Sequence, residues 1–206
     1  MALTLTEYDL PDAFLFNESS EGFIVWQPER SLIVLGQSNT IESSVFSENA
    51  INDNIPVTRR PSGGEAVLLT PLTIAFTVSK SFSAPVHFRD FFRTVNKMVM
   101  ECLGEKGIAD LGFKGISDIA IGNKKILGSS MRNTHSSLIY QAVLNVSEDP
   151  VLFEKYLRHP RREPDYRSGR SHSEFVTSLK AEGYNFAPGE LIGAIERKLR
   201  EYLNEQ

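Results

Sequence analysis

Short apolar runs rich in β-branched and aromatic residues dominate the first half of the chain. Such runs, bounded by Gly, Pro and polar residues, are typical of strands rather than helices. The longest run places Ile74, Phe76 and Val78 on one face of a strand, because successive side chains of a strand point to opposite faces. Strands are therefore predicted over residues 23–26, 32–35, 56–58, 66–69 and 72–78.

Turn residues predict how these strands are connected. The polar tetrapeptide Gln27-Pro28-Glu29-Arg30 favours a hairpin between the first two strands. A short helix is predicted over residues 42–51. Residues 1–20 carry no regular pattern, so no element is predicted there.

Helical periodicity is clearest in residues 88–105. Phe91, Val95, Met98 and Cys102 recur at steps of four and three, which places them on one face of a helix. A proline begins the next predicted helix, as is common at a helix N-terminus. Further helices are predicted over residues 150–157, 171–180 and 188–204.

The second half of the chain also contributes strands, over residues 116–121 and 138–146, on either side of a predicted turn at Lys124-Lys125. Strands and helices do not alternate regularly, so a doubly wound parallel sheet is not expected. The pattern instead predicts an α+β protein, a single domain over residues 1–206. Its sheet is expected to be mixed and mostly antiparallel, with roughly six to eight strands and helices packed on it.

Composition excludes several classes of protein. With 206 residues, of which 41% are hydrophobic and 23% charged, the chain can fill one core. A formal net charge of −4 gives no support to nucleic-acid or membrane-surface binding, and we expect neither partner. The one cysteine, Cys102, fits a reducing compartment, and no basic leader precedes an apolar run at the N-terminus. We therefore expect a cytoplasmic protein without a transmembrane segment.

Two segments carry candidate chemistry. Residues 59–67, Arg-Arg-Pro-Ser-Gly-Gly-Glu-Ala-Val, combine two cations with adjacent glycines, which let backbone N–H groups approach an anion. Residues 118–130 contain a lysine pair followed by small residues, and we expect them to complete the same site. Neither segment matches the G-x-G-x-x-G or Gly-Lys-Ser/Thr fingerprints, so a nucleotide would have to be bound by a different device.

Together the two segments resemble the lipoate-protein ligase family, within the superfamily of biotin/lipoate ligases and octanoyl/lipoyl transferases. The residues that carry the resemblance are Arg-Arg-Pro-Ser-Gly-Gly-x-Ala-Val at 59–67, Asp118 and Lys-Ile-Leu-Gly-Ser-Ser at 125–130. The similarity covers residues 20–180 and includes Glu-Pro-Asp-Tyr-Arg at 163–167. It implies the fold of the class II aminoacyl-tRNA synthetase and biotin ligase catalytic domain, here without a C-terminal accessory domain.

The resemblance implies an ATP-dependent ligase that attaches a lipoyl or octanoyl group to a lysine of a carrier domain. The acyl carboxylate would attack the α-phosphate of ATP to give an acyl-adenylate, from which the carrier lysine takes the acyl group. Lys125 corresponds to the catalytic lysine of the family, and its charge would stabilise the negative charge that develops. Asp118 corresponds to a ligand of the nucleotide or of Mg²⁺. The implied contacts to substrate and adenylate come from Arg60, Ser62, Gly63, Gly64, Ala66, Asp118, Gly128, Ser129 and Ser130.

The implied partners are lipoate or octanoate and a lipoyl carrier domain, of the type found in the glycine cleavage H protein or in the E2 component of 2-oxoacid dehydrogenases. A separate protein supplying the accessory domain is a further candidate partner. The basic residues between 158 and 170 are interpreted as a solvated loop, with docking of an acidic carrier surface as the alternative hypothesis.

Departures from the family pattern leave two alternatives open. One is an ATP-independent lipoyl or octanoyl transferase. Transferases of the superfamily use a cysteine nucleophile, but Cys102 lies on the apolar stripe of a predicted helix and is interpreted as a core thiol. The other alternative is a non-catalytic acyl-binding relative. The departures are Glu65, Leu69, Ser117 and Gln141.

Overall fold

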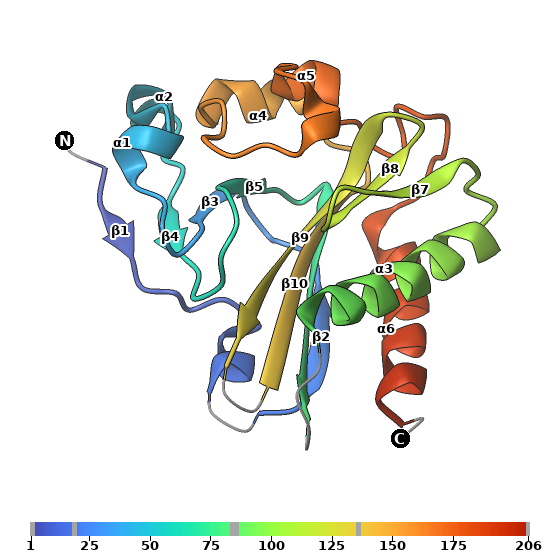
Figure 1. Ribbon diagram of the computed structural model, residues 1–206. Helices are drawn as coiled ribbons and strands as arrows, with labels where there is room; N and C mark the ends of the chain where they lie inside the picture. Colours follow the sequence, from blue (N-terminus) through green and yellow to red (C-terminus); the bar gives the residue numbers. More distant parts are fainter. Residues whose placement is uncertain (1–2, 18–19, 83–86, 135–136, 205–206) are drawn as a thin grey trace.

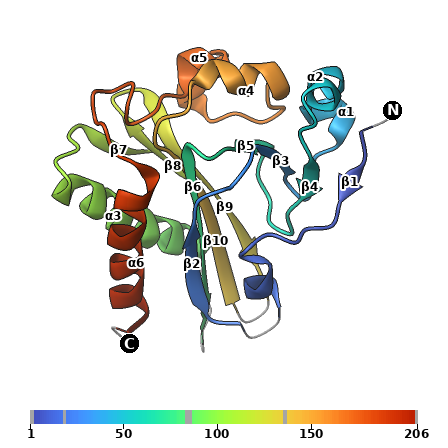
Figure 2. The same ribbon diagram turned by 180° about the vertical axis from the view of Figure 1, so that it is seen from behind.

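The computed structural model describes residues 3–17, 20–82, 87–134 and 137–204. Two β-sheets form its centre, and helices pack on the outer side of each (Figures 1 and 2). The larger sheet has six antiparallel strands in the order β2-β6-β10-β9-β8-β7. These strands are β2 (Gly22–Trp26), β6 (Thr73–Ser81), β7 (Leu111–Lys114), β8 (Asp118–Ile121), β9 (Lys124–Asn133) and β10 (Ser137–Asn145).

The smaller sheet has four strands in the order β1-β4-β3-β5. Strand β4 pairs in parallel with both β1 and β3, and β3 pairs antiparallel with β5. The sheet is therefore mixed, whereas the larger sheet is antiparallel throughout. The strands are β1 (Leu5–Thr6), β3 (Leu32–Leu35), β4 (Val57–Arg59) and β5 (Val67–Leu69).

Side-chain alternation along β3 explains why the smaller sheet is buried on both faces. Leu32 and Val34 pack against Ala75 of the larger sheet. Ile33 and Leu35 point the other way, into a second cluster beneath three short helices. A continuous run of four buried apolar residues is typical of a strand with both faces covered. The helices are α1 (Ile41–Ser44), α2 (Ser47–Asn52) and α4 (Pro150–Tyr156).

Two long helices cover the far face of the larger sheet, α3 (Phe88–Glu105) and α6 (Pro188–Asn204). The apolar stripe predicted from the sequence of α3 is buried, including Phe91, Val95 and Cys102. In the part of the chain that the structure describes, no helix combines the length and apolarity needed to cross a membrane.

The α+β class is confirmed, and so are most predicted elements, the helix over residues 88–105 with its bounds unchanged. The predicted single sheet is in fact two sheets. The predicted hairpin is wrong, because β2 joins the larger sheet and β3 the smaller one. The sequence shows the turn residues between these strands but not which neighbours the strands find.

Three local predictions also need correction. The predicted turn at Lys124-Lys125 is the start of the ten-residue strand β9. The helix predicted over residues 42–51 is interrupted at Val45, which adopts an extended conformation and pairs with Leu157. The helix predicted over 171–180 is a single turn, α5 (His172–Phe175). Strand β7 and the 3-10 helices Ala13–Phe16 and Asp165–Arg167 were not predicted.

Candidate functional site

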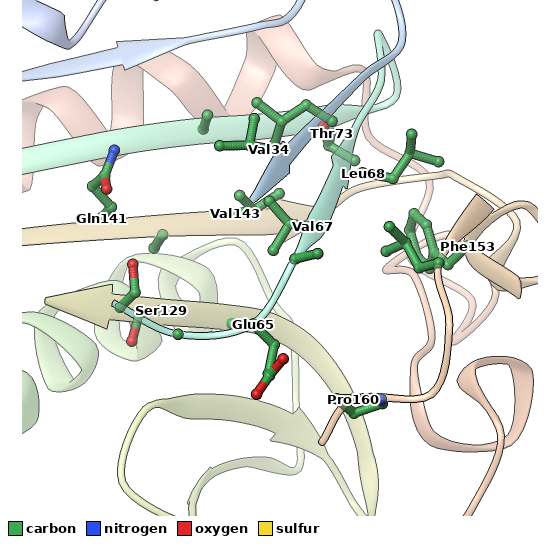
Figure 3. Close-up of a pocket in the computed structure, with 18 of the residues that line it drawn as sticks. Val34, Glu65, Val67, Leu68, Thr73, Ser129, Gln141, Val143, Phe153 and Pro160 are labelled. Atoms are coloured by element: carbon green, nitrogen blue, oxygen red, sulfur yellow. The ribbon is translucent and has the colours of Figure 1, made fainter. Parts of the chain in front are cut away.

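A cavity of about 230 Å³ lies between the two sheets (Figure 3). Val34 and Val67 of the smaller sheet face Val143 of the larger one across it. Glu65 and Pro160 lie at another side of the same cavity. The cavity therefore joins an apolar interior to a wall that carries polar and charged groups.

The larger sheet supplies one wall of the cavity through a row of cross-strand neighbours. Trp26 is paired with Ala75, which is in turn opposite Val143. Val143 faces Gly128 of β9, and Asp118 of β8 is the next member of the row. Paired residues lie on the same face of a sheet, so the row runs from apolar side chains to a carboxylate. Such a gradient suits a ligand that has an apolar chain and a polar head group.

A β-bulge sets the direction of the Lys125 side chain. The register of β8 against β9 shifts by one residue, and Ile126 is the extra residue in β9. Lys125 and Gly128 are three positions apart, so in a regular strand they would point to opposite faces. The bulge instead brings Lys125 to the face that carries Gly128 and Asp118.

Lys125 forms an ion pair with Asp118 at this end of the row, with Nζ 2.9 Å from Oδ1. The Asp118 carboxylate is buried, and its Oδ2 accepts a hydrogen bond from the Tyr166 hydroxyl at 2.8 Å. Burial, together with the charge of Asp118, raises the pKa of Tyr166, so this hydroxyl stays a donor. A Cβ at position 128 would lie 2.6 Å from Lys125 Nζ, so glycine makes room for the lysine to cross the strand. An ammonium has three donors, and Asp118 uses one of them.

Arg60 holds the conformation of the loop that carries Gly63 and Gly64, called the glycine loop below. Arg60 is 5% exposed, and its guanidinium donates to the hydroxyl of Ser62 and to the carbonyls of Gly63, Val34 and Glu65. Burial lowers the pKa of Arg60 to about 10, and the side chain remains charged at neutral pH. These acceptors use most of its donors, so the direct substrate contact expected of Arg60 stays a prediction.

Gln141 fixes the orientation of the Ser62 hydroxyl. Gln141 Nε2 donates to Asp12 Oδ2 at 2.6 Å and to the Tyr8 hydroxyl at 2.9 Å. Its Oε1 must therefore accept from the Ser62 hydroxyl, which leaves Ser62 Oγ to accept from Ser130 at 3.1 Å. The Ser62 proton is thus engaged by Gln141 and is not free to bind a ligand. Sequence reasoning missed Tyr8 and Asp12, because residues 1–20 carry no regular pattern.

The segment after α4 covers the charged end of the cavity. Arg167 is 4% exposed, and its guanidinium carbon lies 4.8 Å from the centre of the Phe175 ring. Lys125 Nζ lies 6.0 Å from the same ring. Among the described residues, Nη2 of Arg167 has no hydrogen-bond partner. The prediction that Arg167 belongs to a solvated loop is therefore wrong. The sequence signal for its burial was Phe175 in the same segment, because an aromatic ring can pack against an arginine.

Most residues of the two predicted segments meet at this cavity. Ser62, Gly63 and Asp118 do not line the cavity themselves; they hold lining residues in place through the hydrogen bonds and the ion pair described above. The predicted residues that line the cavity are Arg60, Gly64, Ala66, Lys125, Gly128, Ser129 and Ser130.

The predicted Mg²⁺ has few protein ligands available. Within residues 3–17, 20–82, 87–134 and 137–204, no cluster of three or more His, Cys, Asp or Glu side chains could hold a metal ion. The oxygens of Asp118 are engaged by Lys125 and Tyr166. Mg²⁺ commonly reaches such sites with substrate phosphates and one carboxylate, so its contact with Asp118 stays a prediction.

Comparison with known families decides the identity of the fold. Residues 2–200 match the family model for the lipoyl protein ligase A/B catalytic domain. The chain belongs to this family. It is accordingly an enzyme of the ligase or transferase kind. A comparison with curated proteins gave no match.

Solved structures of lipoate-protein ligases share the fold of this family member. Lipoate-protein ligase A bound with ATP has a TM-score of 0.77 at 20% identity, over 98% of this chain and 84% of that one. The structure of a bipartite lipoate protein ligase and its E2 lipoyl domain from Thermoplasma acidophilum gives 0.75 at 21% identity, over 88% and 70%. P. falciparum LipL1 in complex with lipoate gives 0.71 at 16% identity, over 89% and 47%.

The cysteine of this lipoyl protein ligase A/B-family domain takes no part in the site. Cys102 is buried in the core between α3 and the larger sheet, and burial raises the pKa of its thiol. It does not line the cavity. The interpretation of Cys102 as a core thiol is confirmed.

Proposed function

We propose that this domain attaches a lipoyl or octanoyl group to a lysine of a carrier domain, through an acyl-adenylate formed from ATP. The observation that carries the proposal is the position of the Lys125 ammonium. It lies at the charged end of a row of apolar side chains, over Gly128 and beside the buried Asp118. A medium-length acyl chain lying along Ala75 and Val143 would bring its carboxylate to this ammonium.

In the first step, an oxygen of the acyl carboxylate attacks the α-phosphorus of ATP. The bond from this phosphorus to the bridging oxygen breaks, and pyrophosphate leaves with the electron pair. Lys125 has donors free to bind the acyl and phosphate oxygens that approach one another. Arg167, buried beside the same Phe175 ring and paired with Glu163 at 3.4 Å, would offer its Nη2, which is unpaired within the described part of the chain, as a further donor to these oxygens.

In the second step, the amine of a carrier lysine attacks the acyl carbon, and AMP leaves. ATP as the co-substrate is supported by the fold shared with a ligase structure that holds ATP. A lipoyl domain as the carrier is supported by the bipartite ligase studied with its E2 lipoyl domain. Exposed Arg161 and Arg162 belong to the segment along the cavity and would meet an acidic carrier surface first.

The test is the release of pyrophosphate when the protein is incubated with ATP, Mg²⁺ and lipoate, or with octanoate in parallel. Lys125→Ala is expected to lower this rate by about 10²-fold or more, because the charge that stabilises the transition state is removed. The matched control is Lys124→Ala, because Lys124 is exposed and does not line the cavity. No pyrophosphate release with either acid would contradict the proposal. Acyl transfer from an acylated carrier without ATP would favour the transferase alternative.

A further inference from the structure

A carboxylate, Glu65, occupies the wall of the cavity directly after the glycine pair. It is half-buried and lines the cavity together with Lys125. The loop is held close to β9, since a Cβ at Gly64 would lie only 3.2 Å from the Cβ of Ser130. In Figure 3 the Glu65 side chain projects from the loop beside β9, and Pro160 lines the same cavity.

Backbone and side-chain contacts hold Glu65 in this position. Asn39 Nδ2 donates to Glu65 Oε2 at 3.1 Å, and the Asn39 amide is oriented by the N–H of Gly36, which donates to its Oδ1 at 2.9 Å. The Glu65 carbonyl accepts from Arg60 Nη2 at 2.9 Å. In the described part of the chain, no lysine, arginine or histidine forms an ion pair with the Glu65 carboxylate. Its remaining lone pairs are therefore available to a ligand.

Among the residues that the structure describes, Asp12 is the only other carboxylate that lines the cavity, and both of its oxygens already accept hydrogen bonds. Asp12 accepts from the Tyr8 hydroxyl at 2.8 Å on one oxygen. Its other oxygen accepts from Thr77 and Gln141, each at 2.6 Å. Glu65 is thus the carboxylate of this cavity that can receive a cation from outside.

The acceptor in the proposed reaction arrives as a cation. A lysine side chain has an ordinary pKa of about 10.4, so at neutral pH it is an ammonium, which has no lone pair for attack. It must also approach Lys125 and Arg167, whose charges already have carboxylate partners in Asp118 and Glu163. A further carboxylate at the cavity wall can bind the arriving ammonium and take up its proton.

We propose that the Glu65 carboxylate binds the ammonium of the acceptor lysine and accepts its proton. This inference rests on the proposed function and assigns a catalytic residue for its second step. Conversion of the ammonium to an amide releases two protons. Glu65 takes the first as the nitrogen lone pair forms the N–C bond to the acyl carbon. The second leaves to water as the C–O bond breaks and AMP departs with that electron pair.

The experiment compares wild type with Glu65→Gln in two reactions started with ATP, Mg²⁺ and lipoate. In one, the acceptor is an unlipoylated E2 lipoyl domain; in the other it is hydroxylamine, which is largely neutral at pH 7.5 and needs no base to expose its lone pair. Glu65→Gln is expected to lower acylation of the lipoyl domain by about 10²-fold or more, and to leave hydroxamate formation unchanged. Glu29→Gln, on the exposed turn between β2 and β3, is the matched control.

The outcomes separate the inference from the proposed function. If wild type forms neither hydroxamate nor pyrophosphate, the proposed function fails. If wild type forms hydroxamate but Glu65→Gln acylates the lipoyl domain at the wild-type rate, the role of Glu65 is overturned. Equal losses in both reactions would also overturn it, because they would place Glu65 in adenylate formation. Glu65→Gly, with a melting curve for each variant, guards against a misfolded glutamine variant.

Discussion

At the scale of single residues, the site depends on space as much as on charge. Lys125 reaches Asp118 only because position 128 carries no side chain. The polar atoms of Ser62 and Arg60 are used in hydrogen bonds that hold the glycine loop in place. The residues that support the loop are therefore distinct from the ammonium that faces the cavity.

Gly128→Ala is expected to lower activity while leaving the fold intact. The new Cβ would lie 2.6 Å from both Cε and Nζ of Lys125, and the flexible end of that side chain can move aside. The ammonium would then lie away from Asp118. Pyrophosphate release should fall to a rate between those of wild type and Lys125→Ala.

The control for this substitution is Gly112→Ala on β7, where a Cβ would meet only Lys114 Cε at 3.9 Å. It adds the same methyl group to the same sheet and should leave the rate unchanged. A wild-type rate for Gly128→Ala would show that the position of the Lys125 ammonium does not limit the reaction.

At the scale of elements, the segment from α4 to α5 is held over the cavity by short polar contacts. Glu154 of α4 accepts hydrogen bonds from the N–H and the hydroxyl of Ser173, each at 2.8 Å. These two bonds lower the pKa of Glu154 from its ordinary 4.5. Because Phe175 and Arg167 belong to the same segment, its attachment affects the charged end of the cavity.

Glu154→Gln is expected to lower the melting temperature at pH 7 by a few degrees, since the charge-assisted bonds are weakened. A carboxyl group whose pKa is lowered by folding contributes stability above its unfolded pKa, and this contribution is lost as the pH falls through the folded pKa. The difference between the variant and wild type should therefore stay nearly constant from pH 7 to about 4.5, and shrink below that as the pH falls through the lowered pKa of the folded state. Melting curves across this range test it.

Glu201→Gln on exposed α6 is the control, because Glu201 forms no hydrogen bond or ion pair among the residues that the structure describes. It should melt like wild type at each pH. If the melting temperatures of Glu154→Gln and wild type differ by the same amount well below pH 4.5, the charge of the Glu154 carboxylate does not stabilise the attachment of α5.

At the scale of the whole molecule, the cavity exists because two sheets pack face to face with an incompletely filled interface. The small side chain of Ala75 lies between Trp26 and Val143 in the row that crosses the larger sheet. A ligand that fills this space binds the folded state and not the unfolded chain, so it must stabilise the protein.

Lipoate or octanoate is expected to raise the melting temperature. At a concentration of about 100 times the dissociation constant the stabilisation is about 2.7 kcal/mol, or roughly 5–10 °C for a protein of this size. Ala75→Phe should fill the interface and abolish the shift. Ala181→Phe, at an exposed position, should keep it. A shift that survives Ala75→Phe would place the acyl chain elsewhere.

The sequence determined the α+β class, the long helix over residues 88–105 and the two segments that meet at the site. Each of these depends on local periodicity or on residue types at close spacing, which a single segment carries by itself. The pairing of one strand with another does not depend on such local patterns. The sequence therefore could not assign β2 and β3 to different sheets, nor show that Lys124 and Lys125 begin a strand.

Only the tertiary structure decided which way Lys125 points and which residues face it. One extra residue in β9 turns its side chain to the face of Gly128 and Asp118, and no sequence pattern marks that bulge. Tyr8 and Asp12 reach Gln141 from the other end of the chain, and Arg167 is buried because Phe175 folds back beside it. The physical reason is common to all three: these contacts depend on which elements pack together, and packing joins residues that local patterns cannot relate.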